Sequence, residues 1–222
     1  MNAGCLARAL LWRSVLTLTG GLRVRGAAGL PASPCVIVAN HNSHADTAAL
    51  IAALPARRCP AVAAAADYWF RGGLRARVCQ ALCGAFPVRR AGGGSADLDA
   101  AARLLAAGRD VIVYPEGTRS RDGAVGEFHR GAARLAAAAG VPLLPVGISG
   151  TRALLAPGGS ATRFRRATVT VSFGVPIPVS GHGMGGVMTQ ARTRVAELAG
   201  SCESQPAGRP AEARKWCAWN LS

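Results

Sequence analysis

Short apolar runs alternate with Ala/Leu-rich stretches of helical length along most of this 222-residue chain. The apolar runs, predicted as strands, lie at residues 35–39, 60–66, 85–89, 110–115, 142–148 and 168–173. The intervening stretches, predicted as helices, lie at residues 45–54, 68–83, 96–107, 129–139 and 186–199. Strands that are apolar throughout and separated by helices are typical of a parallel sheet buried on both faces. We therefore expect one α/β domain with a mostly parallel central sheet flanked by helices.

The length of the chain fits one such domain with short extensions at both ends. Residues 1–22 are leucine-rich but interrupted by Arg13, and no apolar segment reaches the length of about 20 residues that spans a bilayer. We expect an amphipathic helix there, lying either in a membrane interface or against the core. A signal peptide is a third alternative, although no small-residue cleavage site precedes the domain. Residues 23–200 are assigned to the domain and residues 201–222 to a polar tail of low order.

Basic residues greatly outnumber acidic ones, and the formal net charge is +15. No acidic residue lies between Glu127 and Glu197, a stretch that contains eight arginines. A positive field of this kind suits anionic lipid surfaces, phosphorylated substrates or nucleic acid. The zinc-finger spacing, the aromatic and basic strand pattern and the isolated recognition helix of nucleic-acid-binding proteins are all missing. We therefore expect an anionic membrane surface as a partner and no nucleic acid.

The seven cysteines are scattered along the chain and show no metal-site spacing. Most of them stand among apolar residues. The expectation is therefore small buried thiols in a reducing compartment, with no bound metal.

The segment VANHNSHADTAAL directly follows the first predicted strand. On one continuous helix, the spacing of His41 and Asp46 would turn the two side chains about 140° apart. If His41 instead lies in the strand-to-helix loop, the Asp46 carboxylate can accept a hydrogen bond from one imidazole nitrogen and leave the other free as a base. Asn40 and Ser43 are candidates for holding this loop. His44 competes for the role of base but lacks an acidic partner at a matching spacing.

A second polar segment, PEGTRSRDG, follows the predicted strand at 110–115. Ligands commonly bind at the carboxyl ends of parallel strands. Arg119 offers a planar fork suited to phosphate, Gly117 allows close approach of the backbone, and Thr118 adds a hydroxyl group. Glu116 either orients Arg119 or contacts a hydroxyl group of the substrate. The segment indicates a phosphate-binding loop.

The two segments together resemble the glycerolipid acyltransferases, especially the bacterial 1-acylglycerol-3-phosphate acyltransferases. The resemblance rests on His41-x-x-x-x-Asp46 and on Pro-Glu-Gly-Thr-Arg-Ser at 115–120. It extends in the family's order through GAFPVRR at 84–90, FHRGAARLA at 128–136, VPLLPVGISG at 141–150 and VSFGVPIPV at 171–179. The resemblance covers roughly residues 20–180 and implies the α/β fold of the glycerol-3-phosphate acyltransferases.

The resemblance also implies a role for each matching residue. His41 is the expected catalytic base and Asp46 its orienting partner. The expected acceptor-binding residues are Arg90, Glu116, Gly117, Thr118 and Arg119, and the residues expected to shape the substrate or acyl site are Val141 and Pro142. The chain departs from the family at Arg89, a position that is often acidic there, so the head group of the acceptor is open. His129 and His182 match no catalytic block and are expected to be structural or exposed.

The resemblance implies transfer of a fatty acyl group from acyl-CoA or acyl carrier protein to lysophosphatidic acid, without a covalent intermediate, a cofactor or a metal. Another lysophospholipid, a lyso-ornithine lipid or a glycolipid is the alternative acceptor. The expected location is the cytoplasmic face of the cell membrane, as a peripheral or monotopic protein. A non-catalytic membrane-surface protein that kept the fold is a rival hypothesis, and it predicts damage at His41, Asp46 or Arg119. A hydrolase would need a Gly-x-Ser-x-Gly elbow, which is missing around Ser149.

Overall fold

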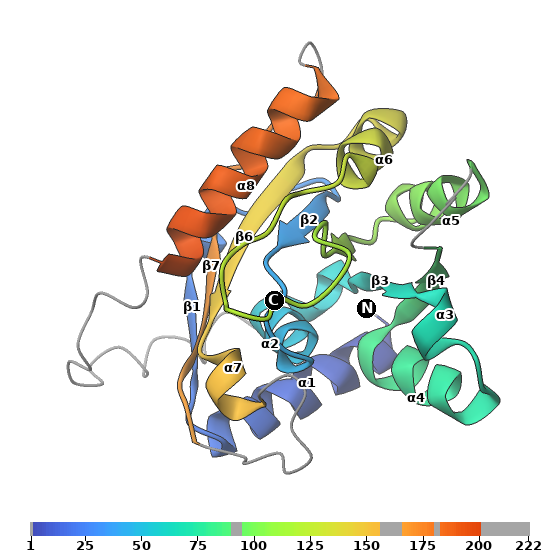
Figure 1. Ribbon diagram of the computed structural model, residues 1–222. Coiled ribbons are helices and arrows are strands. Elements are labelled where there is room, and N and C mark those ends of the chain that lie inside the picture. The colour runs from blue at the N-terminus through green and yellow to red at the C-terminus, as the bar shows by residue number, and fades with distance from the viewer. Residues whose placement is uncertain (1, 90–94, 156–165, 180–182, 201–222) are drawn as a thin grey trace.

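The computed structural model describes residues 2–89, 95–155, 166–179 and 183–200, and its centre is a seven-stranded sheet (Figure 1). The strand order is β1-β7-β6-β2-β5-β3-β4. All neighbouring pairs are parallel except β6 and β7, which are antiparallel. The strands are β1 (Leu22–Arg25), β2 (Val36–Ala39), β3 (Ala61–Ala65), β4 (Ala85–Val88), β5 (Val111–Val113), β6 (Leu143–Ser149) and β7 (Val169–Phe173).

Helices cover both faces of the sheet because side chains alternate along each buried strand. Ile37 and Ala39 of β2 pack in the core under α1, α2 and α7, whereas Val36 and Val38 pack in the core under α5, α6 and α8. The helices are α1 (Ala3–Leu18), α2 (Ala45–Ala53), α3 (Ala66–Trp69), α4 (Gly73–Cys83), α5 (Ser95–Ala106), α6 (Gly131–Ala139), α7 (Thr151–Leu154) and α8 (Met184–Gly200). Two short 3₁₀ turns lie at Ala27–Gly29 and Ala56–Arg58.

The expected α/β fold with a mostly parallel sheet is confirmed, and each of the six predicted strands is present. Three local features differ from the prediction. The helix expected at 68–83 is divided into α3 and α4, with Gly72 in extended backbone before Gly73. Strand β1 begins at Leu22, inside the segment assigned to the N-terminal helix, and the single turn α7 was not predicted.

Helix α1 packs against the domain. Trp12 Nε1 donates to the carbonyl oxygen of Leu82 (2.7 Å), Arg8 Nε to that of Ala81 (3.0 Å), and Arg13 Nη2 to that of Ala52 (3.0 Å). Leucines on its outer side stay exposed, with Leu18 at 74%. Among the described residues, none of the helices is both long and apolar enough to cross a membrane.

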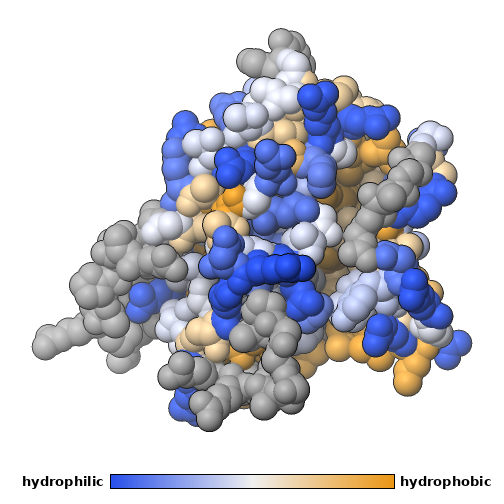
Figure 2. All heavy atoms as spheres, in the orientation of Figure 1, coloured by the Kyte–Doolittle hydropathy of each residue, from blue (hydrophilic) through white to orange (hydrophobic). Residues whose placement is uncertain are grey.

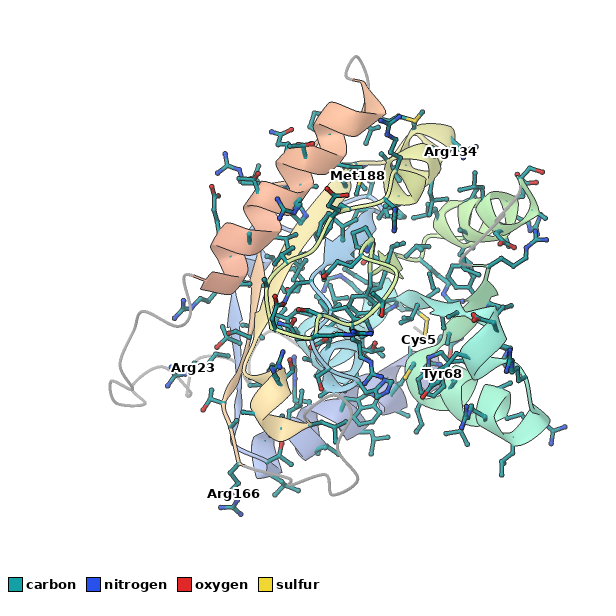
Figure 3. The ribbon with its side chains drawn as sticks, in the orientation of Figure 1. Cys5, Arg23, Tyr68, Arg134, Arg166 and Met188 are labelled. Atoms are coloured by element: carbon teal, nitrogen blue, oxygen red, sulfur yellow. A yellow bond between two sulfur atoms is a disulfide. The ribbon has the colours of Figure 1, made fainter. Side chains whose placement is uncertain are left out.

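Cysteine pairing differs from the expectation of free thiols. Cys5 of α1 and Cys59 form a disulfide that joins segments 54 residues apart (Figure 3). Cys35, Cys79 and Cys83 are free. The expectation fails for Cys5 because the helix packs directly over the turn that carries Cys59, and the one-dimensional spacing gives no sign of that proximity. Residues 201–222, with the last two cysteines, lie outside the described residues.

Candidate active site

The two polar segments meet at the carboxyl ends of β2 and β5, which are parallel neighbours in the sheet. Each segment leaves its strand at the same edge, as expected for parallel strands. The backbone N–H of Ser120 donates to the carbonyl oxygen of His41 (2.7 Å). The N–H of His41 in turn donates to Oε1 of Glu116 (2.8 Å). The first and second segments are therefore joined by hydrogen bonds in both directions.

His41 and Asp46 are paired as the loop argument predicted. Nδ1 of His41 lies 2.9 Å from Oδ2 of Asp46, and the Asp46 side chain is fully buried. The same oxygen accepts hydrogen bonds from the backbone N–H groups of Asn42 and Ser43, both at 2.7 Å. A carboxylate held in this way fixes the protonated nitrogen of the imidazole at Nδ1. No described residue bonds Nε2, so this nitrogen is available to accept a proton from a ligand.

The ring of His41 is held from one side by Tyr114. The two rings are stacked, with centroids 4.1 Å apart and planes 16° apart. The Tyr114 hydroxyl and Oγ1 of Thr47 are hydrogen-bonded at 3.0 Å. Burial raises the pKa of Tyr114 well above its ordinary value, so the phenol stays neutral. The sequence analysis missed this residue, and its position as an aromatic at the end of β5, next to the Pro-Glu-Gly segment, was the available signal.

Asn40 and Ser43 hold the loop, as expected. Asn40 forms two hydrogen bonds with Ile148 of β6, donating from Nδ2 to the carbonyl oxygen (2.9 Å) and accepting at Oδ1 from the N–H (2.8 Å). Ser43 Oγ donates to the carbonyl oxygen of Leu155 (2.8 Å) and accepts from the N–H of Ala45 (3.1 Å). These bonds anchor the loop to β6 and to Leu155, which directly follows α7.

The sequence left two roles open for Glu116, orienting Arg119 or contacting a substrate hydroxyl group, and the structure shows a third set of contacts. Its Oε1 accepts from the N–H of His41, and its Oε2 accepts from the N–H of Gly126 (3.0 Å). Both carboxylate oxygens are thus used by backbone donors, and the side chain does not line the cavity described below. Glu116 therefore ties the two loops together, and its expected contact with the acceptor stays a prediction.

Gly117, Thr118 and Arg119 line a cavity of about 700 Å³ together with His41. Gly117 has a φ of +70°, a left-handed conformation that favours glycine at this turn. Burial lowers the pKa of His44, and the charge of Arg119 lowers it further. His44 also packs edge-on against Trp69, with ring centroids 5.5 Å apart. The site thus presents an Asp-paired imidazole and a guanidinium in one cavity.

The rest of the cavity wall is mostly apolar. Successive residues of β3, from Val62 to Ala65, all line it, so the cavity reaches both faces of that strand. Small and apolar side chains from the surrounding helices continue the wall, including Ala48, Leu82, Leu98, Ala101, Ala132 and Leu135. His129, expected to be structural or exposed, also lines the cavity near Gly117. A space of this shape and lining can hold an alkyl chain.

Two further expected substrate residues, Val141 and Pro142, do not line the cavity. Val141 and Pro142 precede β6 and therefore lie at the amino edge of the sheet, opposite His41. Val141 packs in the core, and the carbonyl oxygen of Pro142 accepts from Val36, so their expected place in the substrate site is wrong. Arg90 lies outside the described residues. Its neighbour Arg89 lines the cavity and bonds Asp97 through its backbone N–H (3.0 Å) and Nε (3.2 Å).

Comparison with known proteins identifies relatives of the chain. The family model Acyltransferase matches residues 21–149, more than half of the chain. The chloroplastic 1-acyl-sn-glycerol-3-phosphate acyltransferase BAT2 of Brassica napus is 31% identical over 185 residues, which are 78% of this chain and 49% of that protein. Human 1-acyl-sn-glycerol-3-phosphate acyltransferase beta is 35% identical over 153 residues, 68% of this chain and 53% of that protein. The chain thus spans about half the length of these relatives.

A solved structure has the same fold. The 1-acyl-sn-glycerophosphate acyltransferase PlsC of Thermotoga maritima superposes with a TM-score of 0.76, covering 92% of this chain and 81% of that one at 22% identity. The family match spans both polar segments, and the structure brings them together in one cavity. The chain belongs to the acyltransferase family.

Proposed function

We propose that this chain transfers a fatty acyl group from acyl-CoA or acyl carrier protein to the free hydroxyl of 1-acyl-sn-glycerol-3-phosphate, giving phosphatidic acid. The observation that carries the proposal is the His41–Asp46 pair, whose imidazole lines the same apolar cavity as Arg119. The names of the relatives support the acceptor. The intact pair speaks against the rival of a non-catalytic protein that kept the fold.

The reaction follows from the paired imidazole. Nε2 of His41 takes the proton of the acceptor hydroxyl while the oxygen attacks the thioester carbonyl. Asp46 stabilises the resulting imidazolium through Nδ1. The tetrahedral intermediate collapses, the C–S bond breaks, and the imidazolium returns its proton to the leaving thiolate. Products are the new ester and the free thiol of the carrier, and the proposed reaction requires no metal or other cofactor. Positioned general-base help of this kind gives roughly 10²–10⁴-fold in rate.

Arg119 is the proposed partner of the acceptor phosphate. Its guanidinium can form two parallel hydrogen bonds to phosphate oxygens. The mostly apolar wall that runs past β3 is the proposed place for acyl chains. The charge of +15 and the exposed leucines of α1 support peripheral attachment to an anionic bilayer at the cytoplasmic face of the membrane.

An acceptor panel with labelled acyl-CoA tests this function. Lysophosphatidic acid is compared with other lysophospholipids, a lyso-ornithine lipid and a lysoglycolipid. His41→Ala is expected to abolish transfer while its urea unfolding curve still shows one cooperative transition of a folded protein. His44→Ala is the matched histidine variant in the same loop and is expected to lose far less activity, because it has no carboxylate partner. Turnover retained by His41→Ala would refute His41 as the catalytic base. Faster transfer to an acceptor other than lysophosphatidic acid would identify that lipid as the substrate.

A further inference from the structure

The segment that contains α3 and α4 exposes apolar side chains. Leu74 is 78% exposed, Val78 47% and Tyr68 43%. Cys79 is the one residue of α4 that is buried. An exposed leucine on its own is ordinary, but several large apolar groups on one short helical segment indicate an interaction surface.

Arginines lie among these apolar groups. Arg71, Arg75 and Arg77 are all exposed, and Asp67 is the single acidic residue between 66 and 83. The Arg75 guanidinium carbon lies 5.3 Å from the centroid of the Tyr68 ring, and its Nη1 donates to the Tyr68 carbonyl oxygen (3.3 Å). We call the surface formed by Tyr68, Leu74, Val78, Arg71, Arg75 and Arg77 the α3–α4 face. Figure 2 shows hydrophobic and hydrophilic side chains side by side over α3 and α4, at the lower right.

The α3–α4 face borders the cavity of the candidate active site. Tyr68 and Val78 are exposed on this face and also line the cavity, as does the neighbouring Trp69. The face therefore forms one rim of the cavity. On its other side α4 meets α1, through the hydrogen bonds of Arg8 and Trp12 to α4 carbonyl oxygens.

We propose that the α3–α4 face docks on an anionic lipid bilayer and holds the rim of the cavity against it. Apolar groups mixed with arginines are the composition of a helix that lies in a membrane interface. The positive charge complements anionic head groups rather than a second copy of this basic chain. A lipid acceptor can then pass between the bilayer and the cavity without crossing water. This last step rests on the proposed function, whereas the docking itself does not.

Vesicle sedimentation of the full chain tests the docking. The vesicles are phosphatidylcholine alone and phosphatidylcholine mixed with phosphatidylglycerol. The variants are Leu74→Ser and the double variant Arg71→Gln/Arg77→Gln, which lie outside the cavity lining. The matched controls are Val175→Ser, a residue 82% exposed before α8, and the double variant Arg103→Gln/Arg194→Gln on α5 and α8.

We expect the double arginine variant to bind anionic vesicles about 30-fold more weakly, since each basic residue near an anionic surface contributes about fivefold. Its binding to phosphatidylcholine vesicles should not change. Leu74→Ser should weaken binding to both vesicle types by about tenfold because less apolar area is buried. Both controls should bind like the wild type. Equal vesicle binding by the face variants and the controls would overturn the proposal.

Activity measurements separate this proposal from the proposed function. On a soluble short-chain acceptor without vesicles, the face variants should match the wild type. On an acceptor embedded in vesicles, their turnover should fall with their vesicle binding. If the wild type shows no transfer to either acceptor but its vesicle binding depends on Leu74 and the arginines, the acyltransfer function fails and the docking stands. If transfer occurs but vesicle binding does not depend on these residues, the docking proposal is refuted and the proposed function is retained.

Discussion

Replacing Asp46 with asparagine is the sharpest perturbation of the candidate base. Oδ2 of Asp46 accepts three hydrogen bonds, from His41 Nδ1 and from the N–H groups of Asn42 and Ser43. In Asp46→Asn the amide oxygen must take this position, because an NH₂ group there would face three donors. The NH₂ group then takes the place of Oδ1, which is buried and has no hydrogen-bond partner among the described residues. The variant therefore loses the negative charge and gains an unsatisfied donor.

The loss in rate follows from the distance within the pair. When His41 takes a proton, its positive charge lies about 4 Å from the centre of the carboxylate, and at an effective dielectric constant of about 20 the attraction is about 4 kcal/mol. Each 1.36 kcal/mol corresponds to tenfold in rate, so kcat should fall about 10³-fold. The KM for the acceptor should change little, because Asp46 does not line the cavity.

The loss in stability is estimated from the hydrogen bonds. A bond to a charged group contributes about 1 kcal/mol more than a bond to a neutral one, which gives about 3 kcal/mol for the three bonds to Oδ2. The unsatisfied NH₂ group adds about 1–3 kcal/mol. Urea unfolding should therefore show a free energy of unfolding lower by about 4–6 kcal/mol.

Asp110→Asn is the control that separates the two losses. Asp110 is also buried and accepts from Arg58 Nη2 (2.7 Å) and the N–H of Cys35 (3.1 Å), but it lies at the amino end of β5, away from the cavity. It should lose stability while keeping the kcat of each folded molecule. Saturating acceptor and a temperature at which both variants are folded give the comparison. A kcat within tenfold of the wild type for folded Asp46→Asn would refute the role of the carboxylate.

Three further changes test other contacts. Glu116→Gln should lower both kcat and the free energy of unfolding, the latter by about 1–3 kcal/mol, because the new NH₂ group faces a backbone N–H. A raised KM for the acceptor with unchanged kcat would instead indicate that Glu116 contacts the substrate. Arg119→Ala should raise the KM of a phosphorylated acceptor by roughly 10- to 100-fold, and an equal rise for an unphosphorylated analogue would contradict the phosphate contact. Cys5→Ser should lower the free energy of unfolding by about 4 kcal/mol, because the Cys5–Cys59 bond closes a long loop. If dithiothreitol leaves the urea unfolding curve of the wild type unchanged, the disulfide is not formed.

The sequence was sufficient to predict the elements that depend on local pattern. The buried strands were found because β2 and β5 are apolar throughout and β6 is apolar up to Ser149. Helix α2 was found because its residues after Thr47 are apolar, and most of them are alanine or leucine, which are strong helix formers. The fold-back of His41 onto Asp46 was predictable because a helix forbids the pairing at that spacing. Strand β1 was missed because it has only 4 residues and begins at Leu22, within the segment that was assigned to the N-terminal helix.

What the sequence could not supply was contact between distant segments. The stacking of Tyr114 on His41 and the bonds of Glu116 depend on the order of β2 and β5 in the sheet, which no local pattern encodes. Val141 and Pro142 were misplaced because their role was taken from the matching motif alone, whereas both residues come before β6 and so lie at the amino edge of the sheet. The disulfide of Cys5 depends on how α1 crosses the domain.

The double attachment of Glu116 limits how the site can move. Since His41 bonds both Glu116 and Ser120 through its own backbone, the base and the arginine loop shift as one unit. Parting these loops to accommodate a longer substrate would break both hydrogen bonds. Under the proposed function, selection among acyl chains would fall to the alanine, leucine and valine side chains that line the cavity, where exchange of one small side chain for a larger one should shorten the preferred chain without disturbing the chemistry.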